Sequence, residues 1–363
     1  MLRVVLLTNI PSPYSLDLFY YLQTKLRYDV HVIYTNSKEE NRQWSIDEKK
    51  FINSTILKSR IIRRRTKTDV QYVHIPRGVV KSLRLINPDV VIAWEYNPAA
   101  LQALMWAKIR KKKFIHMTEG TLYSERYIGM IQRIARSVII RSADAGIVSS
   151  TKSKEKLISW GMPDEKIFLS LLTMDLSIYR TLSNHSQSNR ILYVGSMTKR
   201  KGLDLLIRAL SFVKEKYELR IVGNGSKEEI LQLKDLAKEN GVNDNIVWCG
   251  YKSGSELLEE YCTAAVFVLP TREDCYGMVL LEAYCARLPI VSSKYADGAY
   301  DIVDDGYNGI IVDPYEPEHL AKALSDVITN RSFMVNAAKN DLDKFELSNT
   351  VEGFKDAIQY VTN

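Results

Sequence analysis

Residues 271–289 read TREDCYGMVLLEAYCARLP, and they follow a short apolar run, Ala265–Leu269. Asp274 falls in the polar start of this stretch, a helix is expected to begin near Gly277, and Glu282 lies eight positions after Asp274. An apolar strand, a polar loop and a helix form the repeating unit of an open α/β sheet, whose ligands bind outside the carboxyl ends of the strands. The stretch therefore predicts a ligand site at the edge of a parallel sheet.

The chemistry of the stretch suits a nucleotide. The first N–H groups of a helix lack partners within the helix, so the amides of Gly277 and Met278 can hold a phosphate. A carboxylate farther along, here Glu282, can accept hydrogen bonds from ribose hydroxyls. On spacing alone, an ordinary strand, loop and helix with solvated acids fits equally well.

The same stretch resembles the signature of retaining GT-B glycosyltransferases of family four, in which two acids stand eight positions apart. In that family the first acid, usually Glu, contacts the donor sugar, and the second binds the nucleotide ribose. Here the first position is Asp274 with Glu273 immediately before it, so the resemblance leaves open which of the two faces the sugar. The matching residues are Asp274, Tyr276, Gly277, Val279, Glu282, Ala283 and Pro289.

Length and composition suit a globular chain of two domains. The 363 residues are 46% hydrophobic and 26% charged, and no apolar run reaches the roughly 18 residues of a membrane span. The early apolar run Val4–Leu7 is read as a strand and not as a signal peptide. The four cysteines have no metal-like spacing and are expected to be free thiols in the cytoplasm, with Cys275 a small packing residue and not a nucleophile.

The net charge of +7 hides an asymmetry between the two halves. Residues 1–180 contain 30 Lys and Arg against 16 Asp and Glu, whereas the remainder is acidic. Each cation near an anionic leaflet contributes about 1 kcal/mol, so the basic half is expected to attach peripherally to the inner face of the membrane, although a merely solvated basic face stays open. No nucleic-acid recognition motif is seen. The basic residues cluster at Arg60, Arg63, Arg64, Arg65 and Lys67, and again over 110–113.

Strand and helix patterns alternate through both halves of the chain, which predicts α/β architecture with parallel sheets. A polar stretch, Thr181–Asn189, is read as a linker between domains 1–180 and 190–349. The region Lys38–Lys67 is expected to be an irregular and partly mobile loop. Helices are expected at 16–26, 99–109, 128–140 and 152–160, and strands at 3–7, 30–34, 90–94, 114–117, 145–148, 191–194, 219–222, 246–248, 266–269, 290–292 and 310–312.

This alternation predicts two doubly wound, Rossmann-like domains that face a cleft. The resemblance supplies the name GT-B for that arrangement. It also implies that the first domain binds the acceptor, that the second binds the nucleotide sugar, and that a last helix, about 350–363, packs back on the first domain.

Two glycine turns add to the expected donor site. The loop Gly195–Gly202, GSMTKRKG, follows a strand, and its Arg200 and Lys201 can neutralise two phosphates. Basic residues before a helix are commonplace, but residues 192–210 resemble the family's donor loop, in which this pair contacts the diphosphate. Many members carry Arg directly after the first glycine, where this chain has Ser196. Gly223, which follows another strand, is read either as a donor contact or as a simple turn.

In the first domain, Glu119 ends the segment HMTE at the position where many members carry a His near the reacting sugar. Its carboxylate can orient an acceptor hydroxyl or take its proton, or else it is a helix-capping or solvated Glu. His116 is expected to be buried, and Lys154, Lys156 and Trp160 are read as helix surface and core.

The combined expectation is a metal-independent, retaining hexosyltransferase without a cofactor, acting in bacterial cell-surface polysaccharide biosynthesis. Its donor would be a UDP- or GDP-type sugar, and its acceptor would be a glycan, which the basic N-terminal half and family habit suggest is lipid-linked. Two rivals stay open: a nucleotide-sugar epimerase of the same fold, and a noncatalytic nucleotide-sugar or membrane-binding subunit.

Overall fold

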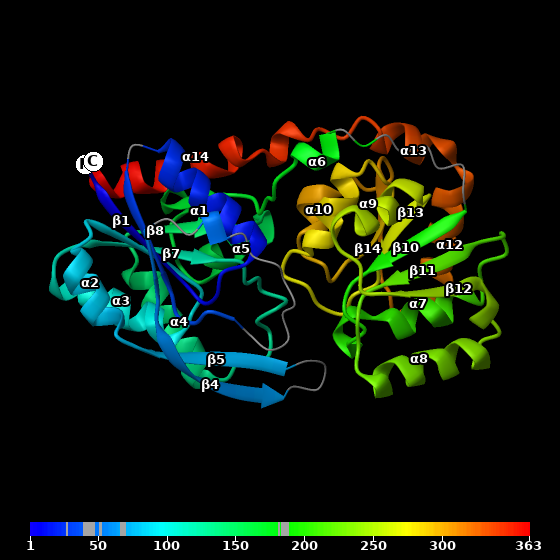
Figure 1. The fold of residues 1–363 in the computed structure, drawn as a ribbon, viewed down its shortest axis with the longest axis horizontal. Coiled ribbons are helices and arrows are strands. Elements are labelled where there is room, and N and C mark those ends of the chain that lie inside the picture. Colours follow the sequence, from blue (N-terminus) through cyan, green and yellow to red (C-terminus); the bar gives the residue numbers. More distant parts are fainter. Residues whose placement is uncertain (27, 39–47, 51–52, 66–69, 181, 183–188) are drawn as a thin grey trace. The chain divides into compact units, whose positions relative to one another are not determined.

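Two parallel β-sheets, each covered by helices on both faces, organise the computed structural model of the chain (Figure 1). The structure describes residues 1–363 except 27, 39–47, 51–52, 66–69, 181 and 183–188. The described residues of 1–65 and 70–175 form one compact unit with Asp343–Asn363, and the described residues of Leu176–Leu342 form the other. The prediction of two doubly wound α/β halves is confirmed.

The first unit contains a seven-stranded sheet with the order β3-β2-β1-β6-β7-β8-β9, in which neighbouring strands are parallel. Successive side chains of a strand point to opposite faces, so Val5 and Leu7 of β1 enter one core while Val4 and Leu6 enter the other. The strands are β1 (Arg3–Thr8), β2 (Asp29–Tyr34), β3 (Ser54–Ile56), β6 (Val90–Trp94), β7 (Lys113–Thr118), β8 (Ala145–Val148) and β9 (Ile167–Leu169).

Helices cover both faces of this sheet. The core around Val5 includes residues of α2 (Val79–Ile86), α3 (Pro98–Ile109), α4 (Met130–Ser142) and α5 (Thr151–Ser159). The core around Val4 includes residues of α1 (Pro13–Lys25) and α14 (Leu347–Thr362).

The last helix, α14, is part of the first unit although it follows the second unit in the sequence. Phe354 and Ile358 are buried among the residues of β1, β6, β7 and β8. Ser170 Oγ, just after β9, donates a hydrogen bond of 2.9 Å to the carbonyl oxygen of Thr350. The sheet face would lose a large part of its apolar cover without this helix.

The second unit has a six-stranded parallel sheet with the order β12-β11-β10-β13-β14-β15. Its core joins strand residues such as Ile191 and Leu219 to helix residues such as Leu206 and Leu324. The strands are β10 (Arg190–Val194), β11 (Glu218–Val222), β12 (Ile246–Gly250), β13 (Val266–Leu269), β14 (Ile290–Ser293) and β15 (Gly309–Val312). The helices are α6 (Ser177–Arg180), α7 (Leu203–Leu210), α8 (Lys227–Glu239), α9 (Gly254–Thr263), α10 (Met278–Cys285), α11 (Ala299–Ile302), α12 (Pro317–Thr329) and α13 (Arg331–Ala337).

The prediction of an irregular loop over Lys38–Lys67 is wrong for much of its described part. It contains β3 and also β4 (Lys58–Arg65), which pairs with β5 (Val70–Arg77) as an antiparallel ribbon outside the main sheet. Residues 39–47, 51–52 and 66–67 of this segment, for which part of the mobility was expected, lie outside the described part of the chain. Most of the expected linker, 181–189, also lies outside it. Each of the eleven predicted strands occurs, whereas β3, β4, β5 and β9 were not predicted.

Candidate functional site

The predicted donor residues gather where the strand order of the second sheet reverses. Strand β10 lies between β11 and β13, so the loops after β10 and β13 leave the sheet side by side. In an open parallel sheet this topological switch point is the place where ligands bind. The first loop contains Arg200 and Lys201 in a short 3-10 turn, Lys199–Lys201, and the second contains Asp274.

A compact ion cluster joins the two loops. Lys201 Nζ lies 2.5 Å from Asp274 Oδ2, and Arg200 Nη1 lies 3.9 Å from the same oxygen. Burial raises the pKa of the Asp274 carboxyl, but the charges of Lys201 and Arg200 outweigh burial and hold that pKa below its ordinary value. Asp274 is therefore an anion over the physiological pH range, with two cations next to it.

Backbone contacts fix the geometry of this cluster. The amide of Arg272 and the hydroxyl of Thr271 both donate to the carbonyl oxygen of Arg200, at 2.8 and 3.0 Å. Arg200 Nη1 donates to the carbonyl oxygen of Glu273 at 2.9 Å. Glu273 thus contacts Arg200 through its backbone carbonyl oxygen, whereas Asp274 contacts Arg200 and Lys201 through its side-chain carboxylate.

The helix α10 begins at the expected glycine. Gly277 has φ +81°, a left-handed conformation that glycine adopts without strain, and Met278 is the first helical residue. Glu282 is buried on this helix, and its Oε2 accepts a hydrogen bond of 2.7 Å from the Tyr261 hydroxyl of α9. Tyr276, which directly precedes Gly277, is also buried. The structure therefore places an oriented carboxylate one to two turns beyond the amides of Gly277 and Met278.

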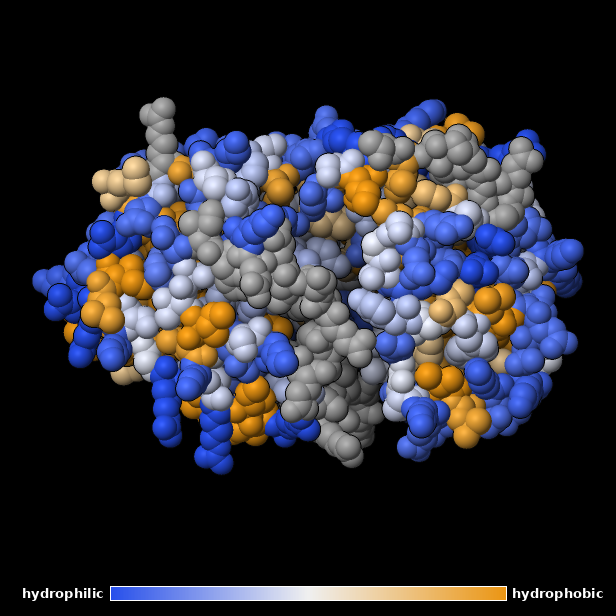
Figure 2. Space-filling model, viewed as in Figure 1, coloured by the Kyte–Doolittle hydropathy of each residue, from blue (hydrophilic) through white to orange (hydrophobic). Residues whose placement is uncertain are grey.

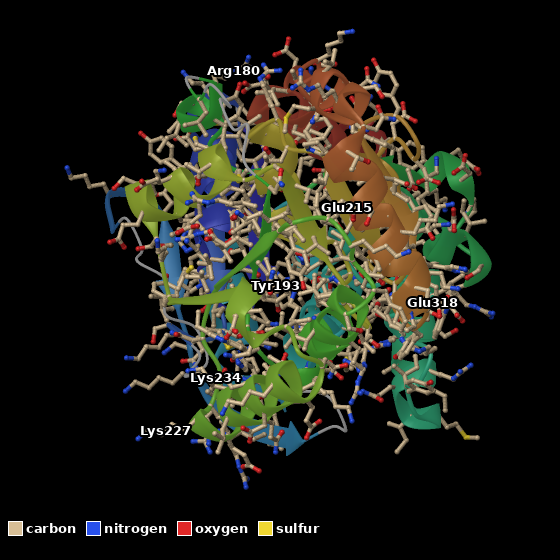
Figure 3. The ribbon with its side chains drawn as sticks, turned by 90° about the vertical axis from the view of Figure 1, so that its right-hand side faces the viewer. Arg180, Tyr193, Glu215, Lys227, Lys234 and Glu318 are labelled. Atoms are coloured by element: carbon tan, nitrogen blue, oxygen red, sulfur yellow. The ribbon has the colours of Figure 1, made fainter. Side chains whose placement is uncertain are left out.

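Gly195 and Gly223 lie against each other at the ends of β10 and β11. Gly223 has φ +141°, and a Cβ atom built on it would lie 1.9 Å from the carbonyl oxygen of Gly195. The hydroxyl of the buried Tyr193, labelled in Figure 3, donates 2.7 Å to the carbonyl oxygen of Ser196 and supports the same turn. A glycine is thus required at position 223, because the backbone there lies against the backbone of Gly195. Gly195 begins the loop that contains Arg200 and Lys201.

In the first unit, Glu119 follows β7 and begins a long connection to α4. Its backbone N–H donates 2.7 Å to the carboxylate of Glu95, and its carbonyl oxygen accepts 2.9 Å from Ser153 Oγ. Glu95 itself follows β6 in a left-handed conformation, φ +63°, which is strained for a residue with a side chain. Since β7 ends at Thr118 and α4 begins at Met130, Glu119 does not cap a helix.

A buried ion network that the sequence patterns do not predict lies beside Glu119. Lys156 is fully buried, and its Nζ lies 2.7 Å from Glu125 Oε1, while Arg136 Nη1 lies 2.7 Å from the other oxygen of Glu125. Burial lowers the pKa of Lys156, opposed chiefly by Glu125. The sequence patterns assign no role to Lys156, and the only sequence signal for its burial is its position beside the apolar Leu157. In the structure Ser153, Lys156 and Leu157 of α5 are all buried.

His116 is buried, as predicted, with its ring 4.4 Å from the ring of Tyr96. Burial lowers the pKa of His116 to about 3, with a further contribution from Lys156. The imidazole is therefore neutral, which suits packing better than catalysis.

No group of three or more His, Cys, Asp and Glu side chains among the described residues is arranged to hold a metal ion. None of the helices formed by these residues is long and apolar enough to cross a membrane.

Comparisons with known proteins point in one direction. The model of the family described as glycosyl transferases group 1 matches residues 179–343, and that of glycosyltransferase family 4 matches residues 16–169. An uncharacterized glycosyltransferase of Methanocaldococcus jannaschii is 29% identical over 269 residues, which are 68% of this chain and 69% of that protein. The amylovoran biosynthesis glycosyltransferase of Erwinia amylovora is 25% identical over 71% of this chain and 68% of its own length.

Structural similarity extends over the whole chain. The crystal structure of HepE of Anabaena in complex with UDP-glucose superposes with a TM-score of 0.76 at 16% identity, covering 99% of this chain and 100% of that one. At this identity the similarity concerns the fold, and it agrees with the two family models that match successive parts of the sequence. The chain belongs to the GT-B glycosyltransferases of the family-four type.

Proposed function

We propose that this glycosyltransferase is a metal-independent, retaining hexosyltransferase that moves a sugar from a UDP- or GDP-type donor to a glycan or lipid-linked acceptor. The observation that carries the donor half of the proposal is the cluster of Arg200 and Lys201 on Asp274 at the switch point of the second sheet. HepE, the Anabaena protein with the same fold, binds UDP-glucose, which supports a nucleotide sugar as the donor.

Arg200 and Lys201 would bind the donor diphosphate. A Lys ammonium has three donors and an Arg guanidinium five, so both can hold a phosphate oxygen while they keep their contacts to Asp274 and Glu273. Charge-assisted bonds from both would stabilise the negative charge that develops on the leaving diphosphate. The amides at the start of α10 add partial positive charge, so a metal ion is not needed for this role.

Glu282 would bind the ribose hydroxyls, with Tyr261 holding one carboxylate oxygen in place. Asp274 is the better of the two candidate acids for orienting the donor sugar, because its carboxylate is part of the ion cluster that would hold the diphosphate. Glu273, through its carbonyl oxygen, would keep Arg200 in position.

In the transfer step, the bond between the anomeric carbon and the diphosphate oxygen breaks and a bond to the acceptor oxygen forms on the same face of the sugar. The acceptor hydroxyl loses its proton, and Glu119 is the residue of the first unit that would accept it. Its backbone is fixed on both sides by Glu95 and Ser153, which suits a positioned base.

The proposed setting is bacterial cell-surface polysaccharide biosynthesis at the cytoplasmic face of an anionic membrane. The relative in Erwinia amylovora acts in amylovoran biosynthesis, which supports a polysaccharide product. The basic balance of residues 1–180 supports contact with anionic lipid.

A panel of UDP- and GDP-sugars tests the proposal by measuring release of free nucleotide. Slow hydrolysis of one donor is expected, and it should disappear together with nucleotide binding in Lys201→Ala and Glu282→Ala. Lys227→Ala, an exposed residue of α8 in the same unit, serves as the matched control. Recovery of an epimerised nucleotide sugar would show that the protein is an epimerase and not a transferase. Tight nucleotide binding without any turnover would favour the noncatalytic subunit.

A further inference from the structure

Helix α4 presents apolar side chains on the side that faces away from its own core. Ile131 is 84% exposed, Met130 77%, Ile134 59% and Val138 47%. Successive helical residues turn by about 100°, so these four positions fall within an arc of about 100°. The buried residues Ile139 and Ile140 lie on the other side of the helix. The outer stripe is therefore not explained by packing within the unit.

The neighbouring helix α3 continues the apolar surface. Met105 and Ile109, one turn apart, are 63% and 76% exposed, and α3 contacts α4. Exposed Tyr127 lies in the loop just before α4, with the Arg126 guanidinium 4.6 Å from the centre of its ring. Figure 2 shows apolar patches among strongly hydrophilic surface on the viewed side of the first unit.

A cationic cleft lies at the carboxyl-terminal ends of the same two helices. Lys108 of α3 pairs at 2.9 Å with Asp144, two residues beyond the end of α4, so the two helix ends meet. The open cleft has a volume of about 590 Å³. Its lining includes four cationic side chains, Lys108, Lys113, Arg141 and Lys166, and one acidic side chain, Asp144.

We infer that this α3–α4 face, defined by the exposed apolar residues of α3 and α4 and the cationic cleft, is the surface that docks on an anionic phospholipid bilayer. The apolar side chains would enter the boundary between headgroups and acyl chains, and the cleft would hold a lipid phosphate. An apolar stripe with flanking cations and an interfacial aromatic residue is the pattern of helices that lie in the plane of a membrane surface. The cations make the patch complementary to anionic lipid and less suited to a neutral protein partner.

This inference rests on the membrane attachment proposed above and names its surface. The rival basic surface is the β4–β5 ribbon, where Arg60 and Arg63 are exposed and Ile62 is 44% exposed. The ribbon also has exposed apolar side chains, Ile61, Ile62, Val73 and Ile75, but these are 38–44% exposed. The apolar side chains of α4 are 47–84% exposed and lie next to a cleft lined by four cations.

The test is cosedimentation of the full chain with vesicles of phosphatidylglycerol and phosphatidylcholine, and with vesicles of phosphatidylcholine alone. Ile131→Ser/Ile134→Ser should weaken binding to the anionic vesicles about tenfold or more, since two large apolar side chains no longer enter the bilayer. Arg141→Gln/Lys166→Gln should weaken it severalfold and reduce its salt dependence. Leu231→Ser, which changes a residue 60% exposed on α8, is the matched apolar control and should bind like the native chain.

The outcomes separate the proposals. If Ile131→Ser/Ile134→Ser binds as tightly as the native chain while Arg60→Gln/Arg63→Gln does not, the ribbon is the docking surface and the inference fails. If the native chain is a dimer by light scattering without lipid and the α4 variant is a monomer, the face is a self-association surface and the inference fails as well. UDP binding measured on the same samples tests the transferase function separately, because the donor residues lie in the second unit.

Discussion

Replacing Lys156 with Met should destabilise the first unit strongly. The ammonium is fully buried, 2.7 Å from Glu125 and 4.3 Å from the centre of the Tyr96 ring. Methionine has a similar length and no charge, so the variant leaves the Glu125 carboxylate without one of its two cations. Removing one partner of a buried ion pair costs about 3–5 kcal/mol of unfolding free energy. Arg136 remains 2.7 Å from the other carboxylate oxygen, so we expect a loss near the lower end, about 3 kcal/mol.

The matched control lies two residues away on the same helix. Lys154 pairs with Asp164 at the same distance of 2.7 Å, but their side chains are 34% and 63% exposed. Exposed pairs contribute about 0–1 kcal/mol, so Lys154→Met should change stability little. The double variant Lys156→Met/Glu125→Gln should lose less than the sum of the two single losses, because it removes both charges of the pair.

Urea unfolding, followed by hydrogen exchange of peptides from β7 and β8, measures the stability of the first unit by itself. This local measurement matters because a chain with two units need not unfold in a single step. If Lys156→Met loses no more unfolding free energy than Lys154→Met, the buried pair does not stabilise the connection that contains Glu119, and the reasoning is refuted.

Three further predictions concern other parts of the chain. Asp274→Asn removes the anion 2.5 Å from Lys201 and should leave UDP affinity equal or up to about tenfold tighter by calorimetry, while donor hydrolysis falls; weaker UDP binding would contradict the proposed roles. Gly223→Ala should cost about 2 kcal/mol or more in thermal unfolding because its Cβ would overlap a carbonyl oxygen, whereas Gly241→Ala, at φ +68° with open space around it, should cost less. The free energy of unfolding should decrease as the pH falls from about 6.5 towards 3, because His116 binds a proton in the unfolded chain but not in the native one, where its pKa is about 3. In urea titrations between about pH 6.5 and 4.5, His116→Leu should reduce this dependence of stability on pH. An unchanged dependence would show that other groups cause it.

The sequence was most informative where strands are buried on both faces. Runs such as Val266–Leu269 and Val90–Trp94 appear as continuous apolar segments, because a parallel sheet covered by helices has no polar face. The loops that follow the parallel strands of one sheet lie at the same edge of that sheet. Arg200, after β10, and Asp274, after β13, could therefore be expected in one site although they are far apart in the sequence.

The antiparallel ribbon was harder to recognise. In β4 the apolar residues Ile61 and Ile62 are adjacent and are surrounded by cations, so the alternation with period two is not visible. Its pairing depends on contacts such as Ile61 with His74 in β5, which only the folded chain shows. The strand β3 is three residues long and lies at the edge of its sheet, too short for a pattern.

The buried ion network was invisible for a related reason. Lysine is rarely buried, so Lys156 is assigned to a helix surface unless its partner is known. That partner, Glu125, lies in the connection before α4, and Arg136 lies within α4. No local spacing rule joins three charges on three different segments.

The place of α14 in the first unit has a consequence for how the chain is made. The ribosome completes the strands of the first sheet before it reaches the second unit, but Val351, Phe354 and Ile358, which cover one face of that sheet, are translated only after the second unit. The second unit, within 176–342, has its full set of strands before that point. The unit that is synthesised first can therefore finish its hydrophobic core only after the second unit has been made and α14 has left the exit tunnel, and until then an apolar sheet face needs protection from aggregation.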